Sequence, residues 1–176
     1  RTRRDHGLRV NSNHLGEVSD QMKALLPQLL CQDNLDSLRG LEGAAATAYF
    51  SVFDQLILND QSVFFFHSRS RRPPLDPVNA LLSFSYSLLS HDCASALEST
   101  GLDSYVGFLH RDRPGRSSLA LDLMEEFRPC IADRFVLSCI NNHIFRKSDF
   151  DYRENGAVFL NESGRRTFLK KWQERK

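Results

Sequence analysis

The sequence lacks the local motifs of several common enzyme classes. It has no P-loop, no G-x-S-x-G turn, no H-E-x-x-H pair and no internal repeat. His110-Arg111-Asp112 is similar to the H-R-D of a kinase catalytic loop, but Ser117 stands where the kinase asparagine would be, and no D-F-G occurs. These absences argue against nucleotide-dependent kinases, serine hydrolases of the α/β type and zinc proteases.

Cysteine is sparse, and long apolar runs are missing. The four cysteines form no C-x-x-C pair and no zinc spacing. Cys93, Cys130 and Cys139 stand in apolar helical contexts, which predicts small buried thiols in a reducing, cytoplasmic compartment. No apolar run reaches the length of a membrane span and no signal peptide is visible, so no membrane association is expected.

The net charge is only +1, but the arginines are clustered. Such clusters can follow a phosphate backbone, and solvated surface is the alternative explanation for each. The chain of 176 residues has room for one domain, and its unpatterned start without Met leads us to expect a piece of a longer protein. The candidate DNA-contacting residues are Arg69, Arg71, Arg72, Arg111, Arg113 and Arg116.

Hydrophobic periodicity predicts a mainly α domain over residues 17–176, preceded by a linker remnant over residues 1–16. Asp33 or Asn34 is expected to cap the second helix, Asp76-Pro77 to start the third, and Pro129 to kink the longest one. Asn155-Gly156 indicates a small hairpin. Helices are predicted over about 17–30, 34–56, 77–99 and 117–145 and from 162 onward, with a short element over 102–109 and the hairpin over 152–160.

Acidic residues and one histidine form a candidate metal site. Asp122 and Glu125 are three apart on a predicted helix, so their carboxylates share a face, and His110 precedes that helix. Glu42 lies beside small residues at 43–46, which suit close approach of another backbone and would place Glu42 at the bottom of a groove. One imidazole with carboxylates suits Mg²⁺ or Mn²⁺. The alternatives are a packing histidine, acids that favour the helix dipole, and an exposed Glu42.

Four stretches in fixed order resemble one known family. They read L-R-G-L-E-G-A-A-A-T-A-Y-F, R-S-R-R-P-P-L-D-P-V-N-A-L-L-S-F-S-Y-S-L-L, G-F-L-H-R-D-R-P-G-R-S-S-L-A-L-D-L-M-E-E-F-R-P and G-A-V-F-L-N-E-S-G-R-R. Together they resemble the C-terminal domain of the CRISPR-associated integrase of spacer acquisition, the first of the Cas proteins, in its type I-C form. The likeness extends from about residue 38 to the end.

The resemblance implies an α-helical catalytic domain that follows an N-terminal β-domain, which this sequence does not include. It makes Glu42, His110 and Glu125 the ligands of a Mg²⁺ or Mn²⁺ ion and Asp122 a further catalytic acid. It also puts Asn79 and Tyr86 beside the site.

The activity so implied is a metal-dependent DNA endonuclease and integrase that inserts new spacer DNA into a CRISPR array through 3′-hydroxyl attack. The implied partners are double-stranded spacer and repeat DNA, a second copy in a full-length homodimer, and the small second Cas protein. A non-catalytic DNA-binding or assembly module is the alternative.

Overall fold

The computed structural model describes residues 10–111 and 113–175. Most of these residues are helical, and a two-stranded antiparallel hairpin lies near the C-terminus, which confirms the predicted mainly α class. The helices run over Ser12–Leu29 (α2), Leu35–Ser51 (α3), Pro77–Ser99 (α4), Ser118–Phe127 (α5), Arg134–Asn141 (α6) and Glu162–Glu174 (α7).

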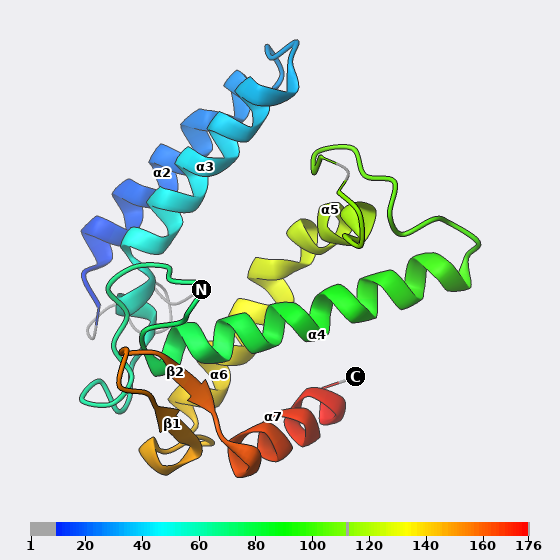
Figure 1. Cartoon of the computed structure of the whole chain (residues 1–176). Helices are drawn as coiled ribbons and strands as arrows, with labels where there is room; N and C mark the ends of the chain where they lie inside the picture. Colours follow the sequence, from blue (N-terminus) through cyan, green and yellow to red (C-terminus); the bar gives the residue numbers. More distant parts are fainter. Residues whose placement is uncertain (1–9, 112, 176) are drawn as a thin grey trace.

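Helices α2 and α3 form an antiparallel pair that projects away from the body of the molecule (Figure 1). Asn11 caps α2 by accepting a hydrogen bond from the backbone of His14, and Asn34 caps α3 in the same way. The pair has its own small cluster of buried side chains, separate from the main core: Val18, Ala48 and Val52. Tyr49 and Phe50, near the end of α3, pack against the main core and join the pair to the body at that end.

Helix α4 crosses the body between α5 on one side and the hairpin and α7 on the other, and α6 contacts it near the hairpin (Figure 1). The predicted start is confirmed, since the Asp76 carboxylate accepts a hydrogen bond from the Asn79 N–H at 2.7 Å and Pro77 takes the first helical position. Gly101, at φ +77°, follows the end of α4. The buried side of α4 carries Val78, Leu81, Leu82 and Leu89.

The predicted kink at Pro129 is confirmed as a π-helical turn, Arg128–Asp133 (η2), between α5 and α6. Proline has no N–H for the preceding turn, so the helix widens there, and such widened turns are frequent at functional sites. Helix α6 ends at Asn141, short of the predicted 145, and the next segment, 142–146, is irregular.

The predicted hairpin is also confirmed, with strands Phe150–Tyr152 (β1) and Val158–Leu160 (β2) paired so that Phe150 faces Leu160. Gly156 takes φ +79° in its turn. Below it, Phe168 of α7 packs edge-on against Phe84 and Phe135, with ring centroids 5.0 and 5.2 Å apart. This aromatic cluster closes the main core.

Several sequence predictions are wrong in detail. Residues 12–16 belong to α2 and not to a linker, while the prediction for residues 1–9 lies outside the described residues. Helix α3 ends at Ser51, where a short 3₁₀ turn, Phe53–Leu56 (η1), follows. The 102–109 segment has no helix or strand, because its backbone bonds to α5 instead of to itself.

Two burial predictions also fail. Cys93 and Cys139 are buried as expected, but Cys130 is exposed on η2. Within residues 10–111 and 113–175, no atom lies within 4 Å of the place where a Cβ on Gly43 would stand, so this glycine does not serve the close approach of a neighbouring backbone. None of the described helices has the length and apolarity needed to cross a membrane.

Candidate active site

The loop that carries His110 is held against the start of α5 by one carboxylate. Asp122 accepts backbone hydrogen bonds from Phe108, Leu109 and His110, at 2.5 to 3.0 Å. Gly107 allows this close approach, because a Cβ there would lie 2.7 Å from the Ser118 Cβ and 3.0 Å from an Asp122 oxygen. The position of His110 is thus fixed from the first turns of α5.

The same carboxylate orients the imidazole. His110 Nδ1 lies 2.6 Å from Asp122 Oδ1, and Asp122 is nearly buried. Burial alone would raise the pKa of Asp122, but the hydrogen bonds from the His110 side chain and three backbone N–H groups outweigh it and lower that pKa. Asp122 and Glu125 therefore do not converge on one point, since Asp122 is engaged by the loop.

Glu125 lies one turn further along α5 and is half-buried. Its carboxylate forms a 2.7 Å ion pair with Arg128, the first residue of η2. Burial raises the pKa of Glu125, Arg128 opposes the rise, and the negative charge of Glu42 adds to it. His110 also interacts electrostatically with Glu125. Glu125 therefore faces both of the other predicted ligands, which come from segments far apart in the sequence.

A groove of about 1090 Å³ separates the α2–α3 pair from α5, and Glu42 of α3 lines it on the side of the pair. Glu42 is exposed, not sunk at the bottom of that groove as predicted, because the body leaves this part of α3 uncovered. Glu125 and the exposed Glu126 lie on the opposite wall. The rest of the lining is mostly apolar and includes Leu25, Leu38, Leu41 and Leu109.

The donor set fits a hard divalent cation: two carboxylates and an imidazole whose Nδ1 is already bonded. A cation between Glu42 and Glu125 would also offset the repulsion that raises the pKa of Glu125. Within residues 10–111 and 113–175, however, no three His, Cys, Asp or Glu side chains are close enough to hold a metal ion as they stand. Metal binding by Glu42, His110 and Glu125 together would require these side chains to come closer to one another.

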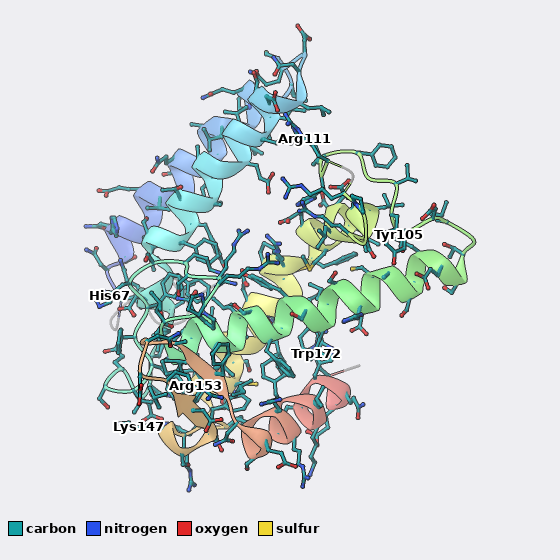
Figure 2. The ribbon with its side chains drawn as sticks, in the orientation of Figure 1. His67, Tyr105, Arg111, Lys147, Arg153 and Trp172 are labelled. Carbon is teal, nitrogen blue, oxygen red and sulfur yellow. The ribbon has the colours of Figure 1, made fainter. Side chains whose placement is uncertain are left out.

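The candidate DNA-contacting arginines fall into two groups. Arg69 is largely buried, and its guanidinium donates to Asn79 Oδ1 at 2.6 Å and to Ser83 Oγ at 3.2 Å, so its contacts are structural. Arg111 is exposed, donates to Asp36 at 3.3 Å and points toward the start of α3 in Figure 2. Arg71, Arg72 and Arg113 are exposed as well, and Arg116 is half-buried.

Asn79 and Tyr86, expected beside the site, are structural groups of α4. Asn79 is fully buried and donates through its amide to Asp76 and to the Ser68 carbonyl. The Tyr86 hydroxyl donates to Asp133 at 2.5 Å, and its ring lies between two guanidinium groups, with Arg128 4.8 Å and Arg69 5.2 Å from the centroid.

Sequence reasoning missed five residues near the site. Arg128 pairs with Glu125, and Asp133 joins Tyr86 to Tyr49 of α3. The i,i+3 spacing of Glu125 and Arg128 could have revealed the first pair, but nothing local links Tyr49 to Asp133. The loop before His110 also exposes aromatic rings: Tyr105, which Figure 2 places on the part of the loop nearer the end of α4, and Phe108, 77% exposed.

The described residues thus combine acids that line a groove, a histidine on the adjacent loop and exposed arginines, which are residue types found at nucleic-acid sites. The family model described as "CRISPR associated protein Cas1" matches residues 1–174. The chain therefore belongs to the Cas1 family of CRISPR-associated proteins. The type I-C likeness stays a prediction.

Curated relatives agree. The chain is 53% identical over its whole length to "CRISPR-associated endonuclease Cas1 2" of Rhodospirillum rubrum, and covers 52% of that protein. It is 49% identical to "CRISPR-associated endonuclease Cas1 1" of Chlorobaculum tepidum, and covers 51% of that one. The chain thus spans about half the length of these relatives.

Solved structures share the fold. A Cas1 protein from Thermotoga maritima superposes with a TM-score of 0.80 at 32% identity, over 88% of this chain and 49% of that one. A casposase bound to its integration product gives a TM-score of 0.77 at 33% identity, over 85% and 42%. A partial Cas6-RT-Cas1–Cas2 complex contains a chain with a TM-score of 0.82 at 29% identity, over 93% and 49%.

Proposed function

We propose that the full-length protein is a divalent-metal-dependent DNA endonuclease and integrase that inserts new spacer DNA into a CRISPR array. The observation that carries this proposal is that Glu42 and Glu125 line one groove, while Asp122 holds His110 on the loop beside it. Family membership supports it, because the curated relatives are named endonucleases and the casposase was solved with an integration product.

Glu42, His110 and Glu125 would hold Mg²⁺ or Mn²⁺, which when bound neutralises charge that develops on phosphoryl oxygens. In the reaction, the 3′-hydroxyl oxygen of the spacer forms a bond to a repeat phosphorus, the bond from that phosphorus to the 3′ oxygen of the repeat strand breaks, and the proton passes from the attacking to the leaving oxygen. Water in place of the hydroxyl gives hydrolysis. No covalent enzyme intermediate is needed.

The chain's own residues contribute binding and orientation. Asp122 holds the His110 ring through Nδ1, which leaves Nε2 as the free nitrogen of the imidazole. Arg71, Arg72 and Arg111 are exposed, and they would contact phosphates in a way that depends on salt and not on sequence. The exposed rings of the 102–109 loop add surfaces on which bases can stack.

The full-length protein carrying Glu42→Ala, His110→Ala or Glu125→Ala tests the proposal in a strand-transfer assay with Mn²⁺. Glu126→Ala is the matched control, because Glu126 is the exposed acid next to Glu125 on the same wall. We expect a loss of at least about 100-fold in the three variants and little change in the control. Full activity in His110→Ala or Glu42→Ala would refute the metal-site assignment and favour a non-catalytic DNA-binding or assembly module.

We also propose that the full-length protein works in the cytoplasm as a homodimer with double-stranded DNA and the small second Cas protein. The solved Cas6-RT-Cas1–Cas2 complexes support the last partner, because a Cas1-like chain is assembled with Cas2 in both. Copurification of the two full-length proteins, with and without DNA, tests this assignment.

A further inference from the structure

Helix α3 carries Glu42 yet has little apolar contact with the body near that residue. Its apolar partner along most of its length is α2, and the cluster they share is separate from the main core. Near the end of α3, past Glu42, Tyr49 and Phe50 do pack against the main core. The groove of about 1090 Å³ runs between α3 and α5 at the level of Glu42. Apolar packing therefore leaves the position of the Glu42 backbone poorly determined relative to His110 and Glu125.

Polar contacts on either side of Glu42 tie α3 to the body. Toward the start of the helix, the Arg39 Nε donates to the Leu109 carbonyl at 2.9 Å, next to His110, and exposed Arg111 donates to Asp36 at 3.3 Å. Toward its end, the Tyr49 hydroxyl donates to Asp133 at 3.1 Å. At about 100° per residue, Arg39, Glu42 and Tyr49 fall on one face of α3, the face turned to the groove.

The contact of Tyr49 involves the carboxyl group of Asp133, which is buried. Asp133 is 1% exposed, and its carboxylate accepts from Tyr86 of α4 and Tyr49 of α3. Burial raises the pKa of Asp133, and the two hydroxyl donors oppose that rise. An ionised carboxylate in such a site requires its donors, so Asp133 fixes the rotation of α3 relative to α4.

We propose that Asp133 and Tyr49 are positioning residues for Glu42, and that with Arg39 they clamp α3 at two points so that Glu42 faces Glu125 across the groove. The expected loss of strand transfer rests on the proposed function, whereas the claim that these contacts hold α3 in place does not. Loss of either contact lets the α2–α3 pair swing on η1, widens the distribution of distances across the groove and lowers the rate of strand transfer.

The chain supplies its own reporters for this motion. Cys31, between α2 and α3, and Cys130, on η2, are exposed thiols on the two sides of the groove. Cys93 and Cys139 are buried, and burial raises the pKa of Cys139 to about 12, so they resist labelling in the native state. Spin labels on Cys31 and Cys130 of the full-length protein, with thiols outside this segment replaced by serine, report the spread of distances by double electron–electron resonance.

The test compares Tyr49→Phe and Arg39→Met with the parent, and Tyr152→Phe serves as the control because that exposed tyrosine lies on the hairpin. We expect a narrow distribution in the parent and the control, and a broadened one in both variants. In Tyr49→Phe we also expect kcat for strand transfer to fall about 10- to 100-fold while KM for DNA changes little.

An unchanged distance distribution in Tyr49→Phe would overturn the proposal, whatever happens to activity. A broadened distribution with parental kcat would overturn the link to Glu42 and leave the proposed function intact. Should the parent itself lack strand transfer, the proposed function fails, and the distance measurement still decides whether the clamp exists.

Discussion

His110 Nδ1 lies 2.6 Å from Asp122 Oδ1, and the same carboxylate accepts the backbone N–H groups of Phe108, Leu109 and His110. The nearly buried Asp122 thus binds both the imidazole of His110 and the loop that carries it. Carboxylates commonly accept a hydrogen bond in this way from the second ring nitrogen of metal-binding histidines.

Replacing Asp122 by asparagine should lower strand transfer by about 10- to 100-fold, because the amide no longer favours a proton on Nδ1. Stability should fall by about 1.5–3 kcal/mol at pH 7, since charge-assisted hydrogen bonds are lost. The pKa of Asp122 is lowered from its usual 3.8 in the folded protein, so its contribution is complete above that value and disappears as pH falls through the folded pKa. Urea unfolding at several pH values measures this; a stability difference that grows toward low pH would contradict it.

Gly107→Ala should destabilise the protein by about 1–3 kcal/mol and displace His110, because the new Cβ meets Ser118 at 2.7 Å. Gly40→Ala is the matched control: a Cβ at that helical position meets nothing within 4 Å, and alanine should raise stability by up to about 1 kcal/mol. Thermal unfolding of both variants checks the sign of each effect. Equal effects would show that the loop does not press on α5.

Removal of the exposed ring in Phe108→Ala should weaken binding of single-stranded DNA by about 5- to 100-fold if bases stack on this loop. Phe159→Ala removes another exposed ring, from β2, and should leave the affinity unchanged. Fluorescence anisotropy with a labelled oligonucleotide measures both, and parental affinity in Phe108→Ala would exclude the stacking surface.

Arg111 and Arg69 should behave differently when replaced by alanine. Loss of exposed Arg111 should reduce DNA affinity and lower the salt slope of binding by about one. Loss of Arg69 should instead cost about 1–3 kcal/mol of stability, because it removes the charged one of the two donors to the buried Asn79 Oδ1 and leaves only the Ser70 N–H. Titrations at several salt concentrations, with parallel unfolding curves, distinguish the two roles. A change in salt slope for Arg69→Ala alone would reverse the assignment.

The stability loss caused by Tyr49→Phe should be larger at pH 7.5 than at pH 4. Burial raises the pKa of Asp133, so its ionised form is the one that most needs the Tyr49 donor, and removal of that donor raises the pKa further. The loss should be about 1.5–3 kcal/mol where Asp133 is ionised, and should shrink as pH falls through the folded pKa. Denaturant unfolding at the two pH values measures the difference; a pH-independent loss would mean that Tyr49 matters through packing alone.

Local residues alone determined most of the helices, the hairpin and the family. Asn34 and Asp76 cap helices through contacts three residues away, and Asn155-Gly156 makes a turn wherever it occurs. The four ordered motifs carried the family likeness, and Glu42, His110, Asp122 and Glu125 were found as candidate site residues because they stand inside those motifs.

The tertiary structure alone decided what each side chain faces. Asp122 turns to His110 and the loop, Arg69 turns inward, and Tyr49 meets Asp133 across 84 positions in the sequence. Such contacts depend on how α3, α4 and η2 pack, and no spacing rule within one element encodes that. The openness of the groove at Glu42 has the same cause, because small residues permit close approach but do not supply a neighbour.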